Sequence, residues 1–278
     1  MYKLPNKSLL AIAGKSLAFL LALKSLLPAS ARADDNPYDL VGKVLVPLAN
    51  LFVAEPKGPN RALSADLVLE EATGLPPEAA GQVISIQVQS PDKLLVRGIA
   101  MGQPLMICRN GQVLWVYPGS KIGALLQSAE LSKADPDFRL PPFQLPVNEK
   151  QLVFLPVLFQ VRDSGEQAVN GVNCRVLDVA LMPELAHSIR AEGWIARLWI
   201  RPAATLSRFE LAHGQWHATV GVKKLVYAPS LAPETWQPDP ETAKDVLQLK
   251  PSRYKQLLDA ASAAFVKYKQ PATAPASN

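Results

Sequence analysis

The sequence predicts an α+β domain that is mostly antiparallel β-sheet, and three observations support this prediction. Residues 81–119 contain β-branched runs separated by turn signals at hairpin spacing. Residues 151–227 repeat the same pattern in a second block. Clear helical spacing of apolar residues occurs mainly near the two ends of the chain.

The first block is predicted as an antiparallel meander. Asn110-Gly111 supplies two residues that accept φ > 0, which predicts a tight type I′ hairpin between the last two strands. Pro118-Gly119 ends the block. The predicted strands are 83–88, 93–97, 105–108 and 112–117.

The second block is also predicted to consist of hairpins. Asn170-Gly171, Pro202-Ala203-Ala204 and His213-Gly214 are its turn signals, and residues 182–193 form a short helical insertion. The predicted strands are 151–161, 173–181, 194–201, 205–211 and 215–227.

Helical patterns surround these blocks. Asn36-Pro37 is an N-cap followed by a proline in the first turn, and apolar residues then recur at helical spacing as far as Phe52. Shorter helical turns are predicted at 122–131, and an amphipathic C-terminal helix at 251–269 precedes a tail, 270–278, that we expect to be disordered.

Two segments allow more than one interpretation. Residues 62–73 fit a helix or a strand, and weak alternation in 65–70 favours a strand leading into the meander. Residues 135–146 contain four prolines and are predicted as a long surface loop. That loop is either a plain connector, which we favour, or a functional lid.

The first 33 residues resemble a secretory signal. Two lysines precede a mostly apolar stretch, and Ala31-Arg32-Ala33 is a small-x-small cleavage pattern. We therefore expect export to the periplasm, cleavage after Ala33 and one main domain over residues 34–250. The alternative is an amphipathic N-terminal helix of the mature fold.

The charge balance argues against nucleic-acid binding. The whole chain has 29 basic and 24 acidic residues. Five of the basic residues lie in 1–33, so the remainder holds 24 of each sign. A formally neutral chain lacks the basic footprint that nucleic acids require.

Cysteine and histidine give limited information. Cys108 and Cys174 each lie in a predicted strand, so in an exported chain they either pair as a disulfide or remain buried reduced thiols. His213 and His217 lack a third ligand at recognisable spacing, so we expect no metal site and no cofactor. No nucleophile elbow, phosphate loop or dinucleotide fingerprint occurs, so a non-catalytic protein is favoured over a hydrolase with scattered catalytic residues.

Several segments, taken in order, resemble the LolA-like periplasmic lipoprotein carriers. Ser90-Pro91-Asp92-Lys93-Leu94 resembles their strand–Pro–strand step, and residues 110–117 resemble their Asn-Gly-x-x-Leu-Trp-x-Tyr hairpin. Residues 170–177 and 198–210 are similar to later strands of that family. The resemblance spans roughly residues 62–240.

The resemblance implies a curved, half-open antiparallel β-barrel wrapped around helices. It also implies an apolar cavity that holds lipid or lipoprotein acyl chains, an inner-membrane transporter as donor and an outer-membrane acceptor. We expect such a carrier to be a monomer. Family members often have a basic residue before the Pro of the first step, whereas this chain has Ser90, which leaves the lipoprotein-release cycle in doubt. The 251–269 helix is also additional to the family core.

Apolar strand residues are the candidate lining of such a cavity, although for any single one of them ordinary core is favoured. Alternation defines two faces for each strand but does not say which one points inward. An alternative function for the same fold is an envelope sensor or assembly protein that binds a protein partner, as RseB resembles LolA in its N-terminal part. The candidate lining residues are Leu94, Val96, Met106, Trp115, Tyr117, Trp199 and Phe209.

Overall fold

The computed structural model describes residues 36–54, 58–74, 79–100, 102–128, 137–145, 147–254 and 256. The chain divides into two compact units, Met1–Asn36 and Pro37–Asn278, and the elements described below belong to the second. The predicted signal 1–33, most of the predicted 251–269 helix and the 270–278 tail lie outside the described residues. Among the described helices, none is long and apolar enough to cross a bilayer.

Eleven strands form one antiparallel sheet. Their order is β11-β5-β4-β3-β2-β1-β10-β9-β8-β7-β6, so β1 and β10 join the two sequence blocks at the centre of the sheet. Within the described residues β11 and β6 are the two edges, and the sheet is not closed. The strands are β1 (Ala62–Ala72), β2 (Val83–Gln89), β3 (Lys93–Ala100), β4 (Gln103–Asn110), β5 (Val113–Tyr117), β6 (Phe159–Val169), β7 (Val172–Leu181), β8 (Trp194–Arg201), β9 (Thr205–His213), β10 (Trp216–Ala228) and β11 (Leu247–Leu249).

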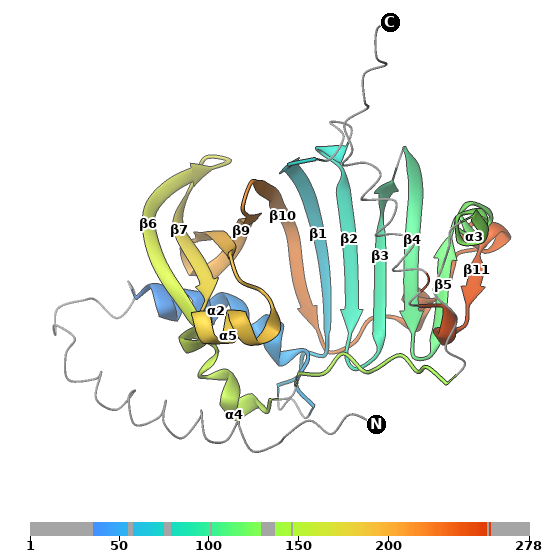
Figure 1. The fold of residues 1–278 in the computed structure, drawn as a ribbon, viewed down its shortest axis with the longest axis horizontal. Coiled ribbons are helices and arrows are strands. Elements are labelled where there is room, and N and C mark those ends of the chain that lie inside the picture. Colours follow the sequence, from blue (N-terminus) through green and yellow to red (C-terminus); the bar gives the residue numbers. More distant parts are fainter. Residues whose placement is uncertain are drawn as a thin grey trace, which may run out of the picture. The chain divides into compact units, whose positions relative to one another are not determined.

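The helices are few and short. Figure 1 shows the sheet curling at its β6–β9 end around α2, with α3 beside β5 and β11 at the other end. The predicted mostly β, half-open curved barrel is therefore confirmed. The α-helices are α2 (Pro37–Asn50), α3 (Gly119–Ser128), α4 (Glu149–Leu152) and α5 (Pro183–Ile189), and the 3₁₀ helices are η3 (Leu155–Leu158), η4 (Pro202–Ala204), η5 (Pro233–Trp236), η6 (Thr242–Asp245) and η7 (Pro251–Arg253).

Residues 62–73 are a strand, as favoured, and β1 is one of the longest in the sheet. Asn170 and Gly171 have φ of 51° and 78° and form the two-residue loop between Val169 and Val172, as a type I′ turn requires. The prediction of a type I′ turn at Asn110-Gly111 is wrong. Asn110 still pairs with Val113, so the loop is Gly111-Gln112, and of these two only Gly111 has positive φ.

The prediction of a strand over 151–161 is also wrong at its start, because residues 151–158 consist of the end of α4, a turn at Val153-Phe154 and η3. Asn148 caps α4 through the Gln151 backbone N–H, while the Gln151 side chain accepts from the Asn148 N–H, which completes a capping box. Pro156 then sits in the first turn of η3, and the strand begins only at Phe159. The periodicity of a short apolar run cannot distinguish a helix from a strand, and here the capping residues start a helix.

Candidate functional site

The pairing register separates the sheet into two chemically different faces. On one face, apolar side chains line up across six neighbouring strands, β10 to β5. Its central row continues onto β11 and consists of Leu225, Ala65, Ile86, Val96, Ile107, Val116 and Leu247. A second row consists of Tyr227, Leu63, Val88, Leu94, Arg109, Leu114 and Leu249.

The opposite face is polar on β1 and β2, whereas on β3 to β5 it carries Leu95, Cys108 and Trp115, which pack with Trp236. Ser85 donates to Asp66 Oδ1 at 2.6 Å, and Arg97 donates to Gln87 Oε1 at 2.9 Å. Strand β2 illustrates the contrast, because Ile84, Ile86 and Val88 alternate with serine and glutamine. We call the first surface the apolar face and the second the outer face.

Helices cover the apolar face at its two ends. At the β6–β9 end, Val41 and Val44 of α2 pack into a buried cluster with Leu177, Leu198 and Ile200. At the β5–β11 end, Leu126 of α3 packs with Leu114, Val116 and Leu249, and Tyr254 lies against this cluster.

Between the two clusters, Leu63, Ala65 and Val88 are buried, but several other apolar side chains on this face are only partly buried. Apolar side chains on a sheet face are normally covered by other core side chains. The partly exposed residues are Leu67, Ile84, Ile86, Leu94, Val96, Leu105 and Ile107.

Arg109 is the charged residue in the second row, and it is only 6% exposed. Its Nε donates to the Gly111 carbonyl at 3.0 Å, and Nη2 donates to the Leu140 carbonyl at 3.2 Å. The guanidinium lies 4.4 Å from the ring centre of Phe143. Burial lowers the pKa of Arg109, and the nearby Asp92 opposes that effect. Arg109 therefore ties the end of β4 to the proline-rich segment.

The described part of that segment, residues 137–145, follows one end of the central strands (Figure 1). The backbone N–H of Phe143 donates to the Pro91 carbonyl at 2.6 Å, and that of Leu145 donates to the Phe52 carbonyl at 2.6 Å. Leu140 is buried and also exchanges two hydrogen bonds with the Gln112 side chain, each 3.0 Å long. The segment belongs to the connection between α3 and α4 and is held in place by these hydrogen bonds.

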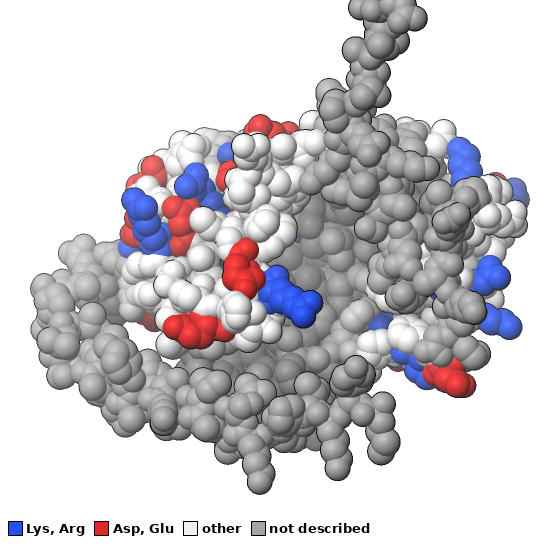
Figure 2. Space-filling model, in the orientation of Figure 1, with Lys and Arg blue, Asp and Glu red and all other residues white. Residues whose placement is uncertain are grey.

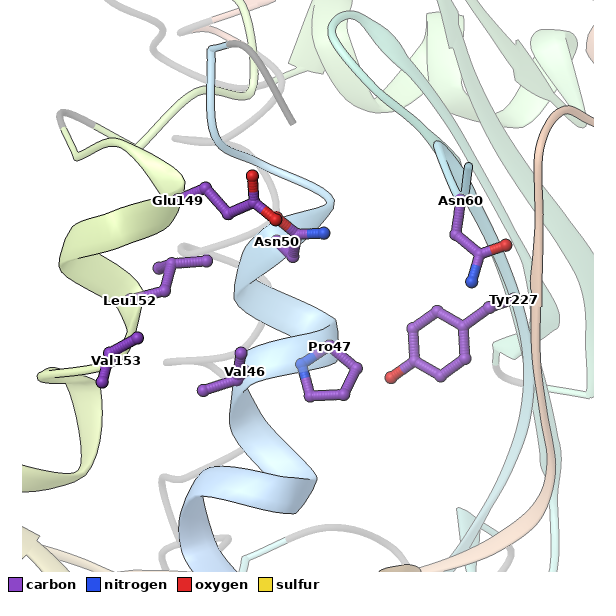
Figure 3. Close-up of a pocket in the computed structure, with 8 residues that line it drawn as sticks. All are labelled: Val46, Pro47, Asn50, Asn60, Glu149, Leu152, Val153 and Tyr227. Carbon is purple, nitrogen blue, oxygen red and sulfur yellow. The ribbon is translucent and has the colours of Figure 1, made fainter. Parts of the chain in front are cut away.

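A cavity of about 390 Å³ lies where α2, α4 and the start of β1 meet β10. Figure 3 shows Tyr227 and Asn60 on one side, facing Pro47 and Asn50 of α2, with the Glu149 side chain near Asn50. Tyr227 belongs to the second row of the apolar face, so the cavity adjoins that face. Burial raises the pKa of Tyr227 to about 12, so its hydroxyl stays neutral at physiological pH. The lining residues are Val46, Pro47, Asn50, Asn60, Glu149, Leu152, Val153 and Tyr227.

The seven residues predicted to line a cavity do not share one face. Leu94, Val96 and Phe209 lie on the apolar face, where Phe209 packs against the α2 cluster. Met106, Trp115, Tyr117 and Trp199 lie on the outer face. The seven therefore cannot line one cavity together, and the register leaves Leu94 and Val96 in the partly exposed centre of the apolar face.

The outer-face aromatics are packed into local cores. Trp115 packs with Leu95, Cys108 and Trp236, and its Nε1 donates to the Trp236 carbonyl at 3.2 Å. Trp199 packs with Cys174 and donates to Gln167 Oε1 at 2.7 Å.

Cys108 and Cys174 are both buried and free. They lie in β4 and β7, which are seven strand positions apart, or roughly 34 Å measured along the sheet at the usual strand spacing. The disulfide alternative is therefore wrong, and the reduced-thiol alternative holds. Burial raises the pKa of Cys108 to about 12, which keeps its thiol protonated.

The three histidines are dispersed. His187 lies 2.8 Å from Glu192 on an exposed turn, and His213 stacks on Trp194. His217 contacts Thr73 Oγ1 at 2.7 Å and Glu71 at 3.1 Å, and it points to the opposite face from His213. No cluster of three or more metal-ligating side chains occurs among the described residues.

Charged side chains of both signs lie at the β6–β8 end of the sheet. Figure 2 shows basic and acidic residues interspersed over the β6–β8 end of the sheet in this view, and Arg175–Asp163 and Arg197–Asp178 pair there at 2.6 Å each. The hydrogen bonds of Arg175 and Arg197 lower the pKa of Asp163 and Asp178, respectively. These pairs connect neighbouring strands.

Sequence reasoning missed the inner residues Ile86 and Ile107, the buried Arg109 and the cavity residue Tyr227. A signal for the first two was present. The strict alternation in β2 marks Ile84, Ile86 and Val88 as one face, and hairpin pairing carries that face to the neighbouring strands. Arg109 carried no such signal, because its partners come from a segment 31 residues away.

No protein-family model and no curated protein sequence matches the chain significantly. Solved structures with a similar fold include LprF from Mycobacterium bovis, with 10% identity, 73% of this chain and 96% of that chain covered, and a TM-score of 0.39. The Mycobacterium tuberculosis lipoprotein LppX has 12% identity, with 71% and 99% covered and a TM-score of 0.36. A LolA superfamily protein from Nitrosomonas europaea has 10% identity, with 73% and 98% covered and a TM-score of 0.24. The matches thus include the superfamily that the sequence motifs resemble, and at these values the function has to be argued from the residues of this chain.

Proposed function

We propose that the protein is a non-catalytic carrier that binds lipid or lipoprotein acyl chains on the apolar face between the α2 and α3 clusters. The observation that carries this proposal is the partly exposed row Ile86–Val96–Ile107, which lies between two ends that are covered by helices. If no ligand bound to this surface, the protein would be more stable with core side chains covering it.

The energetics and dimensions of the surface suit an acyl chain. Each buried methylene contributes about 0.8 kcal/mol, so a long chain binds without a specific polar contact. The six strands from β10 to β5 are separated by five steps of ~4.8 Å, which gives a surface about 24 Å across. The cavity beside Tyr227 extends the same surface toward α4 and has polar groups that suit the head of an amphiphile.

The cellular role that we propose follows from the resemblance. The chain would act as a monomer in the periplasm, after cleavage following Ala33. It would take its cargo from an inner-membrane transporter and deliver it to an outer-membrane acceptor. The anchored 137–145 segment and Arg109 would frame one end of the binding surface.

The test uses adjacent residues that point to opposite faces. Ile86→Glu and Val96→Glu place a carboxylate on the apolar face, whereas Gln87→Glu and Arg97→Glu are the matched outer-face controls. Binding of a fluorescent fatty acid should weaken by roughly tenfold or more in the first pair, because a buried carboxylate must be desolvated, and change little in the second.

Native mass spectrometry of the purified protein, followed by solvent extraction, should identify a co-purified acyl-chain ligand at a defined ratio. Val96→Trp, which fills space without adding charge, covers the case in which the acidic variants fail to fold. Equal affinities in the apolar-face and outer-face variants, together with a ligand-free mass, would sink the proposal.

A further inference from the structure

The segment that was predicted as a strand and found to be helical carries a second apolar surface. Residues 151–161 contain no charged side chain, and α4 and η3 turn this run into a compact projection, seen below α5 in Figure 1. Four of its side chains point into solvent, with 73% of Val153, 51% of Phe154, 42% of Val157 and 44% of Leu158 exposed. We call these four residues the α4–η3 surface.

The other side of the same segment is already satisfied by packing. Leu152 is 2% exposed, and Pro156 lies against α2, where a Cβ added to Gly42 would sit 3.1 Å from the proline ring. The segment is thus fixed to the body of the protein through one side and presents the opposite side outward. Isolated exposed apolar residues are ordinary, but four within six positions on one rigid projection indicate an interaction surface.

We propose that the α4–η3 surface docks on a lipid bilayer. The backbone of the projection meets the first requirement of that environment, which is that polar groups be hydrogen-bonded internally. The Phe154 N–H donates to the Gln151 carbonyl and the Val157 N–H to the Phe154 carbonyl, both at 3.0 Å. The Leu158 carbonyl accepts from the Met182 N–H at 2.9 Å.

The charge pattern around the projection complements a membrane surface. Lys150 and Arg162 are the first charged residues on either side of the uncharged run, and both are exposed. Glu149 and Asp163 are the next charges outward, and Asp163 is paired with Arg175 at 2.6 Å. The exposed cations nearest the apolar projection can thus meet anionic headgroups while the apolar side chains meet hydrocarbon. Protein interfaces of useful size carry a hydrogen bond for every ~100–200 Å², and the four side chains of this surface offer no polar atom for one.

The surface is also continuous with the cavity described above. Val153 belongs to both, and Leu152 lines the cavity from the buried side of α4. A bilayer contacting the α4–η3 surface would therefore lie next to an opening toward the apolar face. Docking itself does not depend on the proposed acyl-chain site, so the two proposals can fail separately.

The test places a reporter in the projection. Phe154→Trp introduces an indole into the α4–η3 surface, and Val226→Trp introduces one at a 46% exposed position on β10 as the matched control. Phosphatidylcholine vesicles with brominated acyl chains should quench the first indole and shift its emission to the blue, and should leave the second unchanged. The reporter lies in the projection, so its signal does not depend on whether residues 1–33 are present in the purified chain.

Affinity is measured by vesicle sedimentation. The triple change Phe154→Ser/Val157→Ser/Leu158→Ser should lower partitioning by roughly tenfold or more, because it removes the largest exposed apolar side chains. Val113→Ser/Val226→Ser is the control of similar starting exposure, at 50% and 46%. Adding phosphatidylglycerol to the vesicles should increase partitioning of the protein. High salt should remove only this increase, because it screens the interaction between exposed charges.

Three results would overturn the proposal. The first is absence of bromolipid quenching in Phe154→Trp while fatty-acid binding in solution persists, which leaves the carrier function intact. The second is binding that requires phosphatidylglycerol and vanishes in salt, which places the contact on charged residues instead. The third is concentration-dependent dimerisation that the triple change abolishes without vesicle binding, which makes the partner a second copy of the chain.

Discussion

Trp236 allows the sharpest test of what holds the outer face of the meander together. It is 2% exposed and packs on Leu95, Cys108 and Trp115. Burying an indole removes roughly 200 Å² from water, worth about 5 kcal/mol at ~25 cal/mol per Å². Its Nε1, however, is buried without an acceptor among the described residues, at a cost of about 1–3 kcal/mol. Trp236→Ala should therefore lower the free energy of unfolding by about 2–4 kcal/mol.

Urea unfolding followed by far-UV circular dichroism measures this loss, which for a chain of this size corresponds to roughly 4–16 °C in Tm. Trp236→Phe separates the two contributions, because it keeps most of the apolar contact and removes the unpaired N–H. It should lie within about 1 kcal/mol of the wild type. Trp194→Ala, at a 42% exposed tryptophan, should cost less than half as much as Trp236→Ala. A cost below about 1 kcal/mol for Trp236→Ala, or a Phe variant as unstable as the Ala variant, would refute the reasoning.

Three further predictions address other contacts. Gly119→Ala should release β11, because the added Cβ would lie only 2.7 Å from the Val246 carbonyl carbon. Hydrogen exchange of the β11 amides should then accelerate, and unchanged protection would contradict the clash. Arg109→Met should lower the free energy of unfolding by about 1–3 kcal/mol and expose residues 137–145 to proteolysis. Arg139→Met should do neither, because that arginine is exposed and, among the described residues, donates to its neighbour's carbonyl. Because the folded state raises the pKa of Cys108 to about 12, the unfolded chain loses this proton first as pH rises, and stability should fall by up to about 1.4 kcal/mol per pH unit above pH ~9. Cys108→Ala should remove that part of the slope in unfolding titrations at pH 8 and 10, and an unchanged slope would contradict the assignment.

The strands and most turns followed from local sequence. Hairpins can be predicted from local sequence, because the paired strands are close in the chain and the turn residues have distinct conformational requirements. Asn170-Gly171 shows this well, with both residues at positive φ. The Asn110-Gly111 error shows the limit, since a shift of one position changes the turn type without disturbing the pairing that follows.

The candidate site was harder to predict because it depends on which face the helices cover. Trp115 and Trp199 are large and lie in strands, so they qualified equally well as cavity lining, yet chain segments remote in sequence bury them on the outer face. Trp236, which covers Trp115, is 121 residues away along the chain. No local pattern encodes such a contact.

An unclosed sheet has two edges, and each edge could recruit a strand from another molecule. The two edges of this sheet oppose that in different ways. β11 is three residues long and is followed by Pro251, so it offers little backbone to pair with. β6 is longer, but its exposed middle carries Arg162, Asp163 and Glu166, and a register shift between Asp163 and Glu166 interrupts its outward ladder. The protein can thus keep a half-open barrel without growing into a fibre, and β6 is the strand in which loss of charge would most readily cause aggregation.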